Sequence, residues 1–163
     1  GIELDIDSEE LQYINGYISD LNGINNTSVS PISSTGLQHV NGTQAMAYCR
    51  IRYTSGGDYK RTERHREVLS KMFEKILPMS PTSYPSLLNE ILPMISTSLS
   101  ASEIMDLGNE VLKVGSTNLE QERFPLDGYC EGQMIGGVYY LTFDKETTVN
   151  QLHDYIFEDK RTW

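Results

Sequence analysis

The sequence predicts a protein of the α/β class, in the form of a three-layer α/β/α domain. The chain has 163 residues, which is enough for one domain with a buried core. Its composition, 38% hydrophobic and 22% charged, excludes general disorder. Segments with apolar residues at helical spacing alternate with short extended segments, as they do where helices cover a sheet.

The first third of the chain predicts a strand, two helices and the turns between them. Ile2, Leu4 and Ile6 alternate with acidic residues, which is typical of a half-buried strand. Apolar residues then recur at helical spacing until an Asn-Gly pair ends the first helix. We therefore expect a strand at 2–6, a helix over 8–22, a loop over 23–36, a short helix over 43–48, an extended segment over 50–53 and a turn over 54–58.

A long helix beginning near Arg61 dominates the rest of the chain. Its apolar stripe reaches Leu77, and Pro78 with Pro81 stops it. A continuous apolar and aromatic run at 138–143 is typical of a strand in a buried sheet. The further elements expected are helices over 83–96 and 102–113, strands over 118–126 and 138–143, and a closing helix over 151–158.

The net charge of −10 hides one basic segment. Residues 50–66 contain six of the 13 basic residues and only two acidic ones, a local excess of four positive charges. A basic island in an acidic protein suits a small anion, because the surrounding negative field repels an extended nucleic acid. The alternative is an ordinary solvated run of charge.

Cations occupy the face of the long helix that points into the protein. Counting back from Val68 by three and four residues, the apolar stripe continues through His65, Arg64 and Arg61. A buried guanidinium is too costly to keep alone, so its partner is either a buried carboxylate or an anionic ligand. Backbone amides at the start of the helix add donors for an anion at the same place.

A second pair of arginines precedes this helix. In extended backbone Arg50 and Arg52 share one face while Ile51 points to the core. Guanidinium groups from a strand and a helix suit a pyrophosphate, whose oxygens accept bidentate hydrogen bonds. Asp58 either orients an arginine, accepts a proton from a hydroxyl group, or serves only as a turn or N-cap residue.

The sequence predicts neither a membrane span nor a metal site. No stretch approaches 18 uncharged apolar residues, and the first residues lack the pattern of a signal peptide. Cys49 and Cys130 have no metal-like spacing, and they either form one disulfide in an oxidising compartment or are two buried thiols.

A long motif surrounds the arginines. Its residues are Leu37, Val40, Asn41, Gly42, Gln44, Ala45, Ala47, Tyr48, Arg50 and Arg52, followed by Gly57, Asp58, Arg61 and Arg64. This pattern resembles the signature of the LytR-CpsA-Psr (LCP) family, and the order of elements from Pro125 onward is similar to the end of the family's domain. The resemblance covers nearly the whole chain and implies that residues 1–163 are the C-terminal portion of one LCP domain, whose N-terminal strands precede residue 1.

The resemblance implies an enzyme of the Gram-positive cell envelope. Family members face outward from the membrane, to which an N-terminal helix anchors them. They transfer an anionic glycopolymer, of teichoic acid or capsule type, from a polyprenyl-diphosphate carrier to peptidoglycan, with pyrophosphatase as an expected side activity. Mg²⁺ is the expected cofactor, with its ligands in the preceding strands and none in residues 1–163.

The resemblance also assigns roles to residues of the basic segment. The residues expected to bind the pyrophosphate are Arg50, Arg52, Arg61, Arg64 and His65. The family usually has Gln where this chain has His65; both side chains can donate to a phosphate oxygen, but His titrates near neutral pH. Arg61 and Asp58 are the expected catalytic residues, because a cation at Arg61 stabilises charge developing on the transferring phosphoryl group and magnesium shares that work.

Two other functions stay open. The family has been described as transcriptional attenuators. Tyr48, Tyr53 and Tyr59 lie among the arginines, as aromatic side chains do where they stack on nucleic-acid bases. A pI of 4.7 argues against a nucleic-acid partner, since such domains are expected above about 9. A non-catalytic module that binds polyprenyl phosphate or glycopolymer would carry the same arginines.

Overall fold

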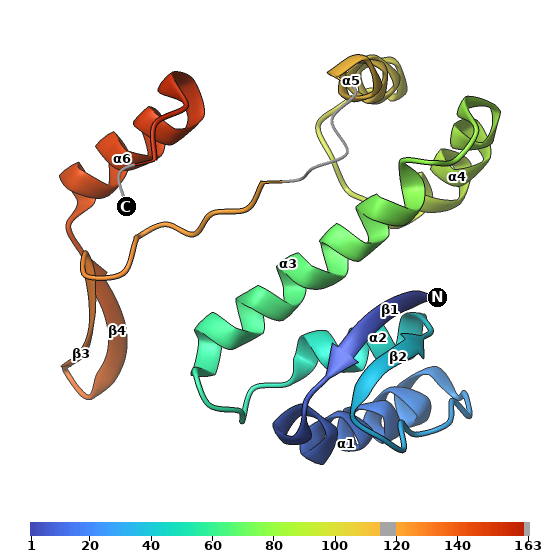
Figure 1. Cartoon of the computed structure of the whole chain (residues 1–163), viewed down its shortest axis with the longest axis horizontal. Helices are drawn as coiled ribbons and strands as arrows, with labels where there is room; N and C mark the ends of the chain where they lie inside the picture. Colours follow the sequence, from blue (N-terminus) through green and yellow to red (C-terminus); the bar gives the residue numbers. More distant parts are fainter. Residues whose placement is uncertain (115–119, 162–163) are drawn as a thin grey trace. The chain divides into compact units, whose positions relative to one another are not determined.

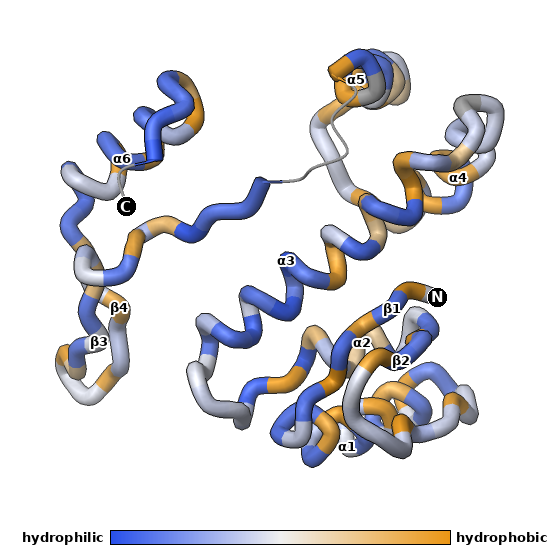
Figure 2. Tube along the Cα trace, in the orientation of Figure 1, coloured by the Kyte–Doolittle hydropathy of each residue, from blue (hydrophilic) through white to orange (hydrophobic). Residues whose placement is uncertain are grey.

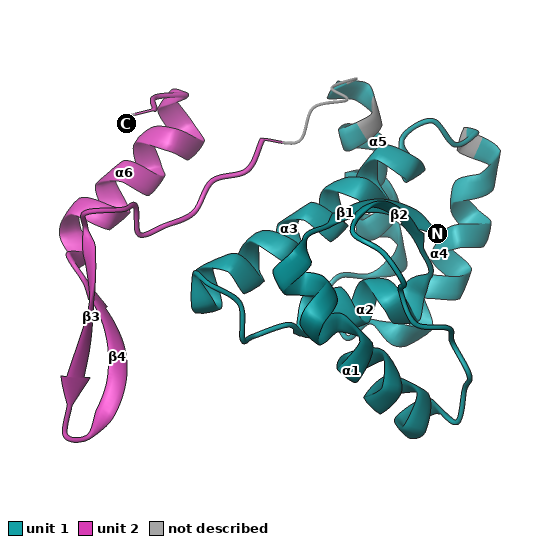
Figure 3. Cartoon of the chain, turned by 60° about the horizontal axis from the view of Figure 1, so that its bottom comes forward, with its two compact units in different colours: residues 1–119 teal, residues 120–163 magenta. Residues whose placement is uncertain are grey.

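The computed structural model describes residues 1–114 and 120–161. The chain divides into two compact units, residues 1–119 and residues 120–163 (Figure 3), and each unit is described by itself. The single domain expected over residues 1–163 stays a prediction. None of the described helices combines the length and the apolar character that crossing a bilayer requires.

The first unit is a mixture of helices and strands (Figure 1), so the α/β class is confirmed. Its elements are β1 (Ile2–Ile6), α1 (Ser8–Asn25), β2 (Gly36–Val40), α2 (Gly42–Arg50), α3 (Gly57–Ile76), η1 (Pro81–Ser83), α4 (Tyr84–Ile91), η2 (Leu92–Met94) and α5 (Ala101–Val114). The helix expected over 83–96 is shorter, because it ends at Ile91 and a single 3-10 turn containing Pro93 follows. Proline cannot donate the backbone hydrogen bond that a continuing helix needs.

β1 and β2 form a two-stranded antiparallel sheet, with Ile2 opposite Val40 and Ile6 opposite Gly36. Leu4 and Ile6 are buried, as their alternation with acidic residues predicts. No strand was predicted at β2, whose first residue fell in the loop expected over 23–36. The less exposed positions of β2 are Gly36, Gln38 and Val40, of which only Val40 is a large apolar residue, so the sequence lacks the apolar alternation that marks a half-buried strand.

α1 begins at a capping box. The Asp7 carboxylate accepts a hydrogen bond from the Glu10 backbone N–H, and the Glu10 carboxylate accepts one from the Asp7 N–H. The helix ends at Asn25, three residues later than expected, and its C-cap Asn26 has the left-handed conformation. Its apolar face packs on α2, and its buried residues are Glu10, Ile14, Ile18 and Leu21.

The core of the first unit lies between the β1–β2 sheet, α1, α2 and the middle of α3. Figure 2 shows hydrophobic segments in β1, α1 and α2, whereas the first half of α3 is mostly hydrophilic. The buried hydrophobic residues are Leu4, Ile6, Ile14, Ile18, Leu21, Ile32, Val40, Ala45, Ala47, Tyr48, Ile51 and Val68. Val68 is the α3 residue in this cluster. The core therefore ends at Val68, and the cations of α3 lie on the N-terminal side of it.

Two further expectations for the first unit are wrong in detail. Residues 50–53 do not form a strand, because α2 continues through Arg50 and its C-cap, Ile51, is followed by a loop. Leu69 was assigned to the inward stripe of α3, but it is exposed. Each residue turns a helix by about 100°, so Leu69 points well away from its buried neighbour Val68.

The second unit is a β-hairpin followed by a helix. Its elements are β3 (Cys130–Ile135), β4 (Val138–Phe143) and α6 (Lys145–Glu158). β3 pairs antiparallel with β4, and Gly136 and Gly137 both have positive φ at the turn between them. Asp144 caps α6 by accepting a hydrogen bond from the Thr147 N–H, so the helix begins six residues earlier than expected.

Three expectations for the second unit are wrong. Residues 120–126 have no strand, and residues 118 and 119 of that expected strand lie outside the described residues. β3 was not expected, because its polar residues hide the strand pattern. β4 is a strand as predicted, but its side chains are mostly exposed in this unit instead of buried. Within the unit, Phe124 packs on Tyr155 with ring centroids 5.9 Å apart.

The core position of Ile14 gives a first prediction. Ile14→Ala should lower the free energy of unfolding by about 2–5 kcal/mol, because it leaves a cavity in the fully buried side of α1. Ile24→Ala, at the end of the same helix, should change it by less than about 0.5 kcal/mol, since Ile24 is 69% exposed. Urea unfolding followed by circular dichroism measures both values, and equal losses would contradict this core assignment.

Candidate functional site

The candidate site lies at the beginning of α3. Gly56 and Gly57 have positive φ values of 87° and 54°, which lets the chain turn from the preceding loop into the helix. The helix then directs Arg61, Arg64 and His65 inward, with Arg64 buried and the other two partly buried. The inward stripe of cations predicted from residue spacing is therefore confirmed.

Arg64 has a buried carboxylate as its partner. Its Nε donates to Glu10 Oε1 at 2.8 Å, its Nη2 donates to Thr54 Oγ1 at 2.6 Å, and its side chain is 1% exposed. A longer contact of 3.4 Å joins Nη1 to the carbonyl oxygen of Ile51. Of the two partners that the sequence left open, the structure has the carboxylate. The expectation that Arg64 contacts a pyrophosphate is corrected, because its guanidinium faces protein atoms.

Arg61 and Asp58 form an accessible pair one turn apart. Arg61 Nη1 donates to Asp58 Oδ1 at 3.3 Å, and the side chains are 29% and 84% exposed. The Arg61 Nε atom is buried and has no hydrogen-bond partner among the described residues. Such an exposed pair is worth little in stability. Of the three roles expected for Asp58, this contact matches the orientation of an arginine. Arg61 keeps further N–H donors for a ligand.

Arg50 and Arg52 do not share the face of a strand. Arg50 is the last residue of α2, and its guanidinium lies over the ring of Tyr17, 6.0 Å from the centroid. Arg52 is exposed in the following loop, while Ile51 between them is fully buried. The inward position of Ile51 is as predicted, but the two guanidinium groups are placed by different elements.

His65 and Glu67 are both engaged by α2. His65 Nε2 lies 2.8 Å from the carbonyl oxygen of Cys49, which can only accept, so this nitrogen carries the proton. Its Nδ1 can therefore donate to a phosphate oxygen only when the ring is protonated. Glu67 was expected to face solvent, but it accepts a hydrogen bond of 2.7 Å from the Tyr48 hydroxyl.

The Tyr48 hydroxyl and the Cys49 thiol both have perturbed acidities. Burial, followed by the hydrogen bond to Glu67, raises the pKa of Tyr48 far above its ordinary value. Burial also raises the pKa of the Cys49 thiol, although the positive charge of Arg64 acts in the opposite direction. Both groups are therefore neutral at physiological pH.

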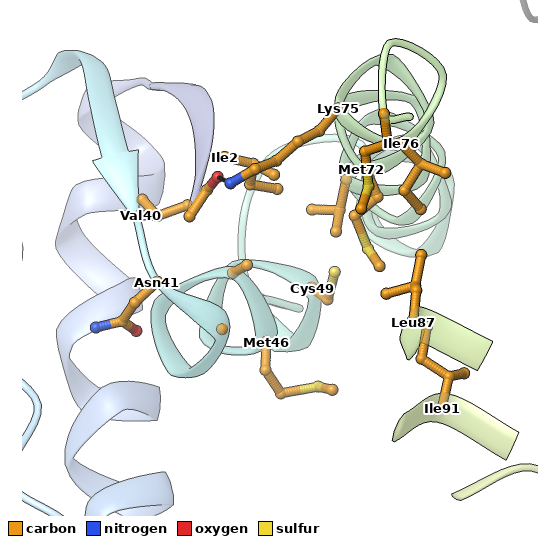
Figure 4. Close-up of a pocket in the computed structure, with 15 residues that line it drawn as sticks. Ile2, Val40, Asn41, Met46, Cys49, Met72, Lys75, Ile76, Leu87 and Ile91 are labelled. Atoms are coloured by element: carbon orange, nitrogen blue, oxygen red, sulfur yellow. Dashed lines mark hydrogen bonds between the residues drawn. The ribbon is translucent and has the colours of Figure 1, made fainter. Parts of the chain in front are cut away.

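An apolar pocket of about 450 Å³ begins one turn beyond His65. Figure 4 shows Met46 and Cys49 of α2, Met72 and Ile76 of α3, and Leu87 and Ile91 of α4 around it. A second apolar pocket of about 380 Å³ lies between α3, α4 and α5. The two pockets share Ile76, Leu87 and Ile91, so apolar surface continues from α2 to α5.

The described residues do not form a metal centre. Over residues 1–114 and 120–161, no group of three or more His, Cys, Asp or Glu side chains is arranged to hold a metal ion. Asp58 is a carboxylate near the arginines, but its described partner is Arg61. The donor set of this part of the chain therefore does not fit Mg²⁺.

Sequence reasoning missed the hydrogen-bond acceptors of Arg64 and Tyr48. Glu10 and Thr54 accept from Arg64, and Glu67 accepts from the Tyr48 hydroxyl. One signal for Glu10 was present: it stands three residues after Asp7 at the start of a helix, the spacing of a capping box. That spacing explains one carboxylate oxygen and does not reveal that the other reaches α3.

Helix α3 thus has cations in its first half and lines an apolar pocket with its second half. The LytR_cpsA_psr family model matches residues 1–155, and the chain belongs to this family. Biofilm regulatory protein A of Streptococcus mutans is 30% identical over 118 residues, which are 68% of this chain and 27% of that protein.

Two further relatives carry more specific names. The polyisoprenyl-teichoic acid–peptidoglycan teichoic acid transferase TagU of Enterococcus faecalis is 32% identical over 95 residues, which are 55% of this chain and 31% of that protein. The solved structure of TagT bound to LIIa-WTA matches with a TM-score of 0.59 at 21% identity, over 98% of this chain and 53% of that one. The last likeness shows the fold alone. The chain spans less than a third of these two curated relatives and about half of that solved chain.

The buried hydroxyl of Tyr48 gives a second prediction. Tyr48→Phe should lower the free energy of unfolding by about 1 kcal/mol at pH 7, because Glu67 loses a hydrogen bond. The raised pKa means that this phenol stabilises the fold fully below its ordinary pKa, near 10, and loses that contribution as the pH rises further. The free energy of unfolding of wild type should therefore exceed that of Tyr48→Phe by less and less as the pH rises above about 10.

Urea unfolding at pH 7 and at alkaline pH tests this prediction. Tyr53→Phe is the matched control, since the Tyr53 side chain is exposed and its ring contact with Tyr13 is kept. A Tyr48→Phe variant as stable as wild type at pH 7 would contradict the role given to the hydrogen bond.

Proposed function

We propose that this chain is the C-terminal portion of an extracytoplasmic phosphotransferase. The full-length protein, anchored to the membrane by an N-terminal helix, would attach a polyprenyl-diphosphate-linked anionic glycopolymer, of teichoic acid or capsule type, to peptidoglycan. The observation that carries the proposal is that one helix, α3, has the accessible Arg61 in its first turns and an apolar pocket along its second half, from Val68 onward.

The arginines supply the site for the diphosphate. Arg61 and Arg52 are accessible, and both present guanidinium groups that fit phosphate oxygens bidentately. Arg50 adds a third cation when its side chain leaves the ring of Tyr17.

The apolar pocket supplies the site for the polyprenyl chain. Arg61 and Val68 are seven residues apart on one helix, which is roughly 10 Å along its axis. A lipid whose diphosphate lies at Arg61 would therefore place its first isoprenyl units at the pocket. Methionines at positions 46 and 72 line this pocket, and their flexible thioethers adapt to an irregular apolar chain.

The proposed reaction breaks one phosphoanhydride bond and forms one phosphodiester bond. A hydroxyl oxygen of peptidoglycan attacks the phosphorus that carries the glycopolymer, and polyprenyl monophosphate leaves. In this proposal Asp58, which contacts Arg61, accepts the hydroxyl proton, and Arg61 stabilises the negative charge that builds on the transferring group. With water as the acceptor, the same step would be a pyrophosphatase side reaction.

Magnesium remains part of the proposal for the full-length protein. In related chemistry the ion neutralises charge on the phosphate oxygens. The described residues of this chain do not fit it, so each step of the proposed reaction uses only protein side chains.

Two relatives support the choice of substrate. TagU carries the name of a teichoic acid transferase that acts on peptidoglycan, and TagT has been solved with LIIa-WTA bound. The first resembles this chain in sequence and the second in fold. We therefore favour transfer of a teichoic acid type polymer over a purely non-catalytic binding role.

Replacing Arg61 tests the proposed chemistry. In the full-length protein with magnesium and a polyprenyl-diphosphate glycopolymer, Arg61→Ala should lower the rate of transfer by about a hundredfold to a thousandfold, or about 3–4 kcal/mol. The effect on substrate binding should be smaller, because the charge on the phosphoryl group peaks in the transition state. Arg61→Lys should not restore the rate fully, since a point charge cannot replace the guanidinium fork.

Arg66→Ala is the matched control on the same helix and should keep the wild-type rate. The two variants are compared at equal concentrations of folded protein. Equal rates for Arg61→Ala and Arg66→Ala would contradict the catalytic assignment, and binding without transfer by the wild-type protein would favour the non-catalytic module.

Replacing Met72 tests the lipid site. Met72→Glu places a carboxylate in the pocket and should raise KM for a long polyprenyl substrate about tenfold or more, since each buried methylene contributes about 0.8 kcal/mol. A diphosphate substrate that carries no prenyl chain should be unaffected. Leu69→Glu is the control, because Leu69 is exposed on the same helix and does not line the pocket. A long-chain KM unchanged by Met72→Glu would exclude this pocket as the lipid site.

A further inference from the structure

A buried polar cluster lies beneath the loop that joins α2 to α3. The loop, residues 51–56, has two buried side chains among exposed ones. Ile51 and Thr54 are buried, while Arg52, Tyr53 and Ser55 are exposed. The loop therefore presents Arg52 between two inward anchor points.

Arg64 binds both anchor points. Its Nη1 contacts the carbonyl oxygen of Ile51, and its Nη2 donates to the Thr54 hydroxyl at 2.6 Å. The backbone that carries Arg52 is thus fixed by one guanidinium immediately before and two residues after it. The same guanidinium lies 5.7 Å from the centroid of the Tyr48 ring, which packs against it.

Glu10 connects this guanidinium to the start of α1. One of its carboxylate oxygens accepts from Arg64 Nε, and the other accepts from the Asp7 N–H in the capping box. Next to it, Glu9 Oε2 accepts from both the backbone N–H and the hydroxyl of Ser55. The first turn of α1 therefore holds the loop directly and through Arg64.

We infer that Glu10 and Thr54 are positioning residues for the anion site. Through Arg64 they fix the 51–56 loop, and with it Arg52 and the entry into α3 that carries Asp58 and Arg61. This inference rests on the proposed function, and it assigns the buried arginine of the motif to the alignment of the site. Small displacements of positioned groups cost large factors in binding and rate, because preorganised donors act at fixed distances.

The test uses the full-length protein and inorganic pyrophosphate as the probe. Thr54→Val removes only the hydroxyl acceptor of Arg64 and keeps the shape of the side chain. It should weaken pyrophosphate binding about tenfold, or about 1.4 kcal/mol, as measured by calorimetry. Thr54→Ser, which restores the hydroxyl, should bind within about twofold of wild type, and Glu10→Gln should weaken binding at least as much as Thr54→Val.

Ile18→Val separates positioning from general stability. Ile18 is buried in α1 away from the polar cluster, and the substitution costs stability without changing a hydrogen bond. It should leave pyrophosphate affinity unchanged at equal folded concentration. Wild-type affinity in Thr54→Val, or an equal loss in Ile18→Val, would overturn the positioning role.

Arg61→Ala distinguishes this inference from the proposed function. Weakened pyrophosphate binding in Arg61→Ala together with wild-type binding in Thr54→Val and Glu10→Gln would overturn the positioning role alone. Unchanged pyrophosphate binding in Arg61→Ala would overturn the anion site on which both proposals depend.

Discussion

The buried ion pair between Glu10 and Arg64 is the contact on which the first unit depends. Taking two charges out of water is expensive, and their mutual attraction offsets the cost only when the remaining hydrogen-bonding groups are also satisfied. In this unit the carboxylate also caps α1, and the guanidinium also binds Thr54 and the Ile51 carbonyl. One pair thereby joins the first turn of α1, the loop before α3 and the middle of α3.

This arrangement divides the cations of α3 into two kinds. Arg64 points to the protein interior and has protein partners for its nitrogens, whereas Arg61 lies nearer the surface and retains a buried Nε without a described partner. Residues three apart on a helix lie near one face, so a small difference in depth separates a cation that holds the fold from one that can meet a ligand. The polar half of α3 then gives way to the apolar half at Val68, where the pocket begins.

Hydrophobic and polar constraints meet at α2. Ala45, Ala47 and Tyr48 bury its inner face, and their small or flat side chains allow α1 and α3 to approach closely. The Tyr48 ring contacts the Arg64 guanidinium, while its hydroxyl binds Glu67 one turn further along α3. The backbone carbonyl of Cys49, in α2, accepts a hydrogen bond from His65, in α3. The packing of α2 on α3 therefore sets both the depth of the cations and one wall of the apolar pocket.

The sequence by itself determined the elements whose signals are local. β1 followed from the alternation of Ile2, Leu4 and Ile6, and α3 from a stripe of apolar residues stopped by prolines. The family also followed from a local motif, since the arginine spacing is a property of the chain. β2 and β3 were missed because neither segment alternates apolar and polar residues, and their pairing partners supply the hydrogen bonds that make them strands.

Only the tertiary structure decided which arginine has which partner. The sequence placed Arg64 on an inward face and required a carboxylate or an anion there, but Glu10 stands 54 residues away along the chain. The strand expected for Arg50 and Arg52 likewise gave way to the end of α2, because tertiary packing outweighs weak local preferences over a few residues. Partners so distant in sequence are brought together by the packing of α1 on α2 and α3, and no local pattern records that contact.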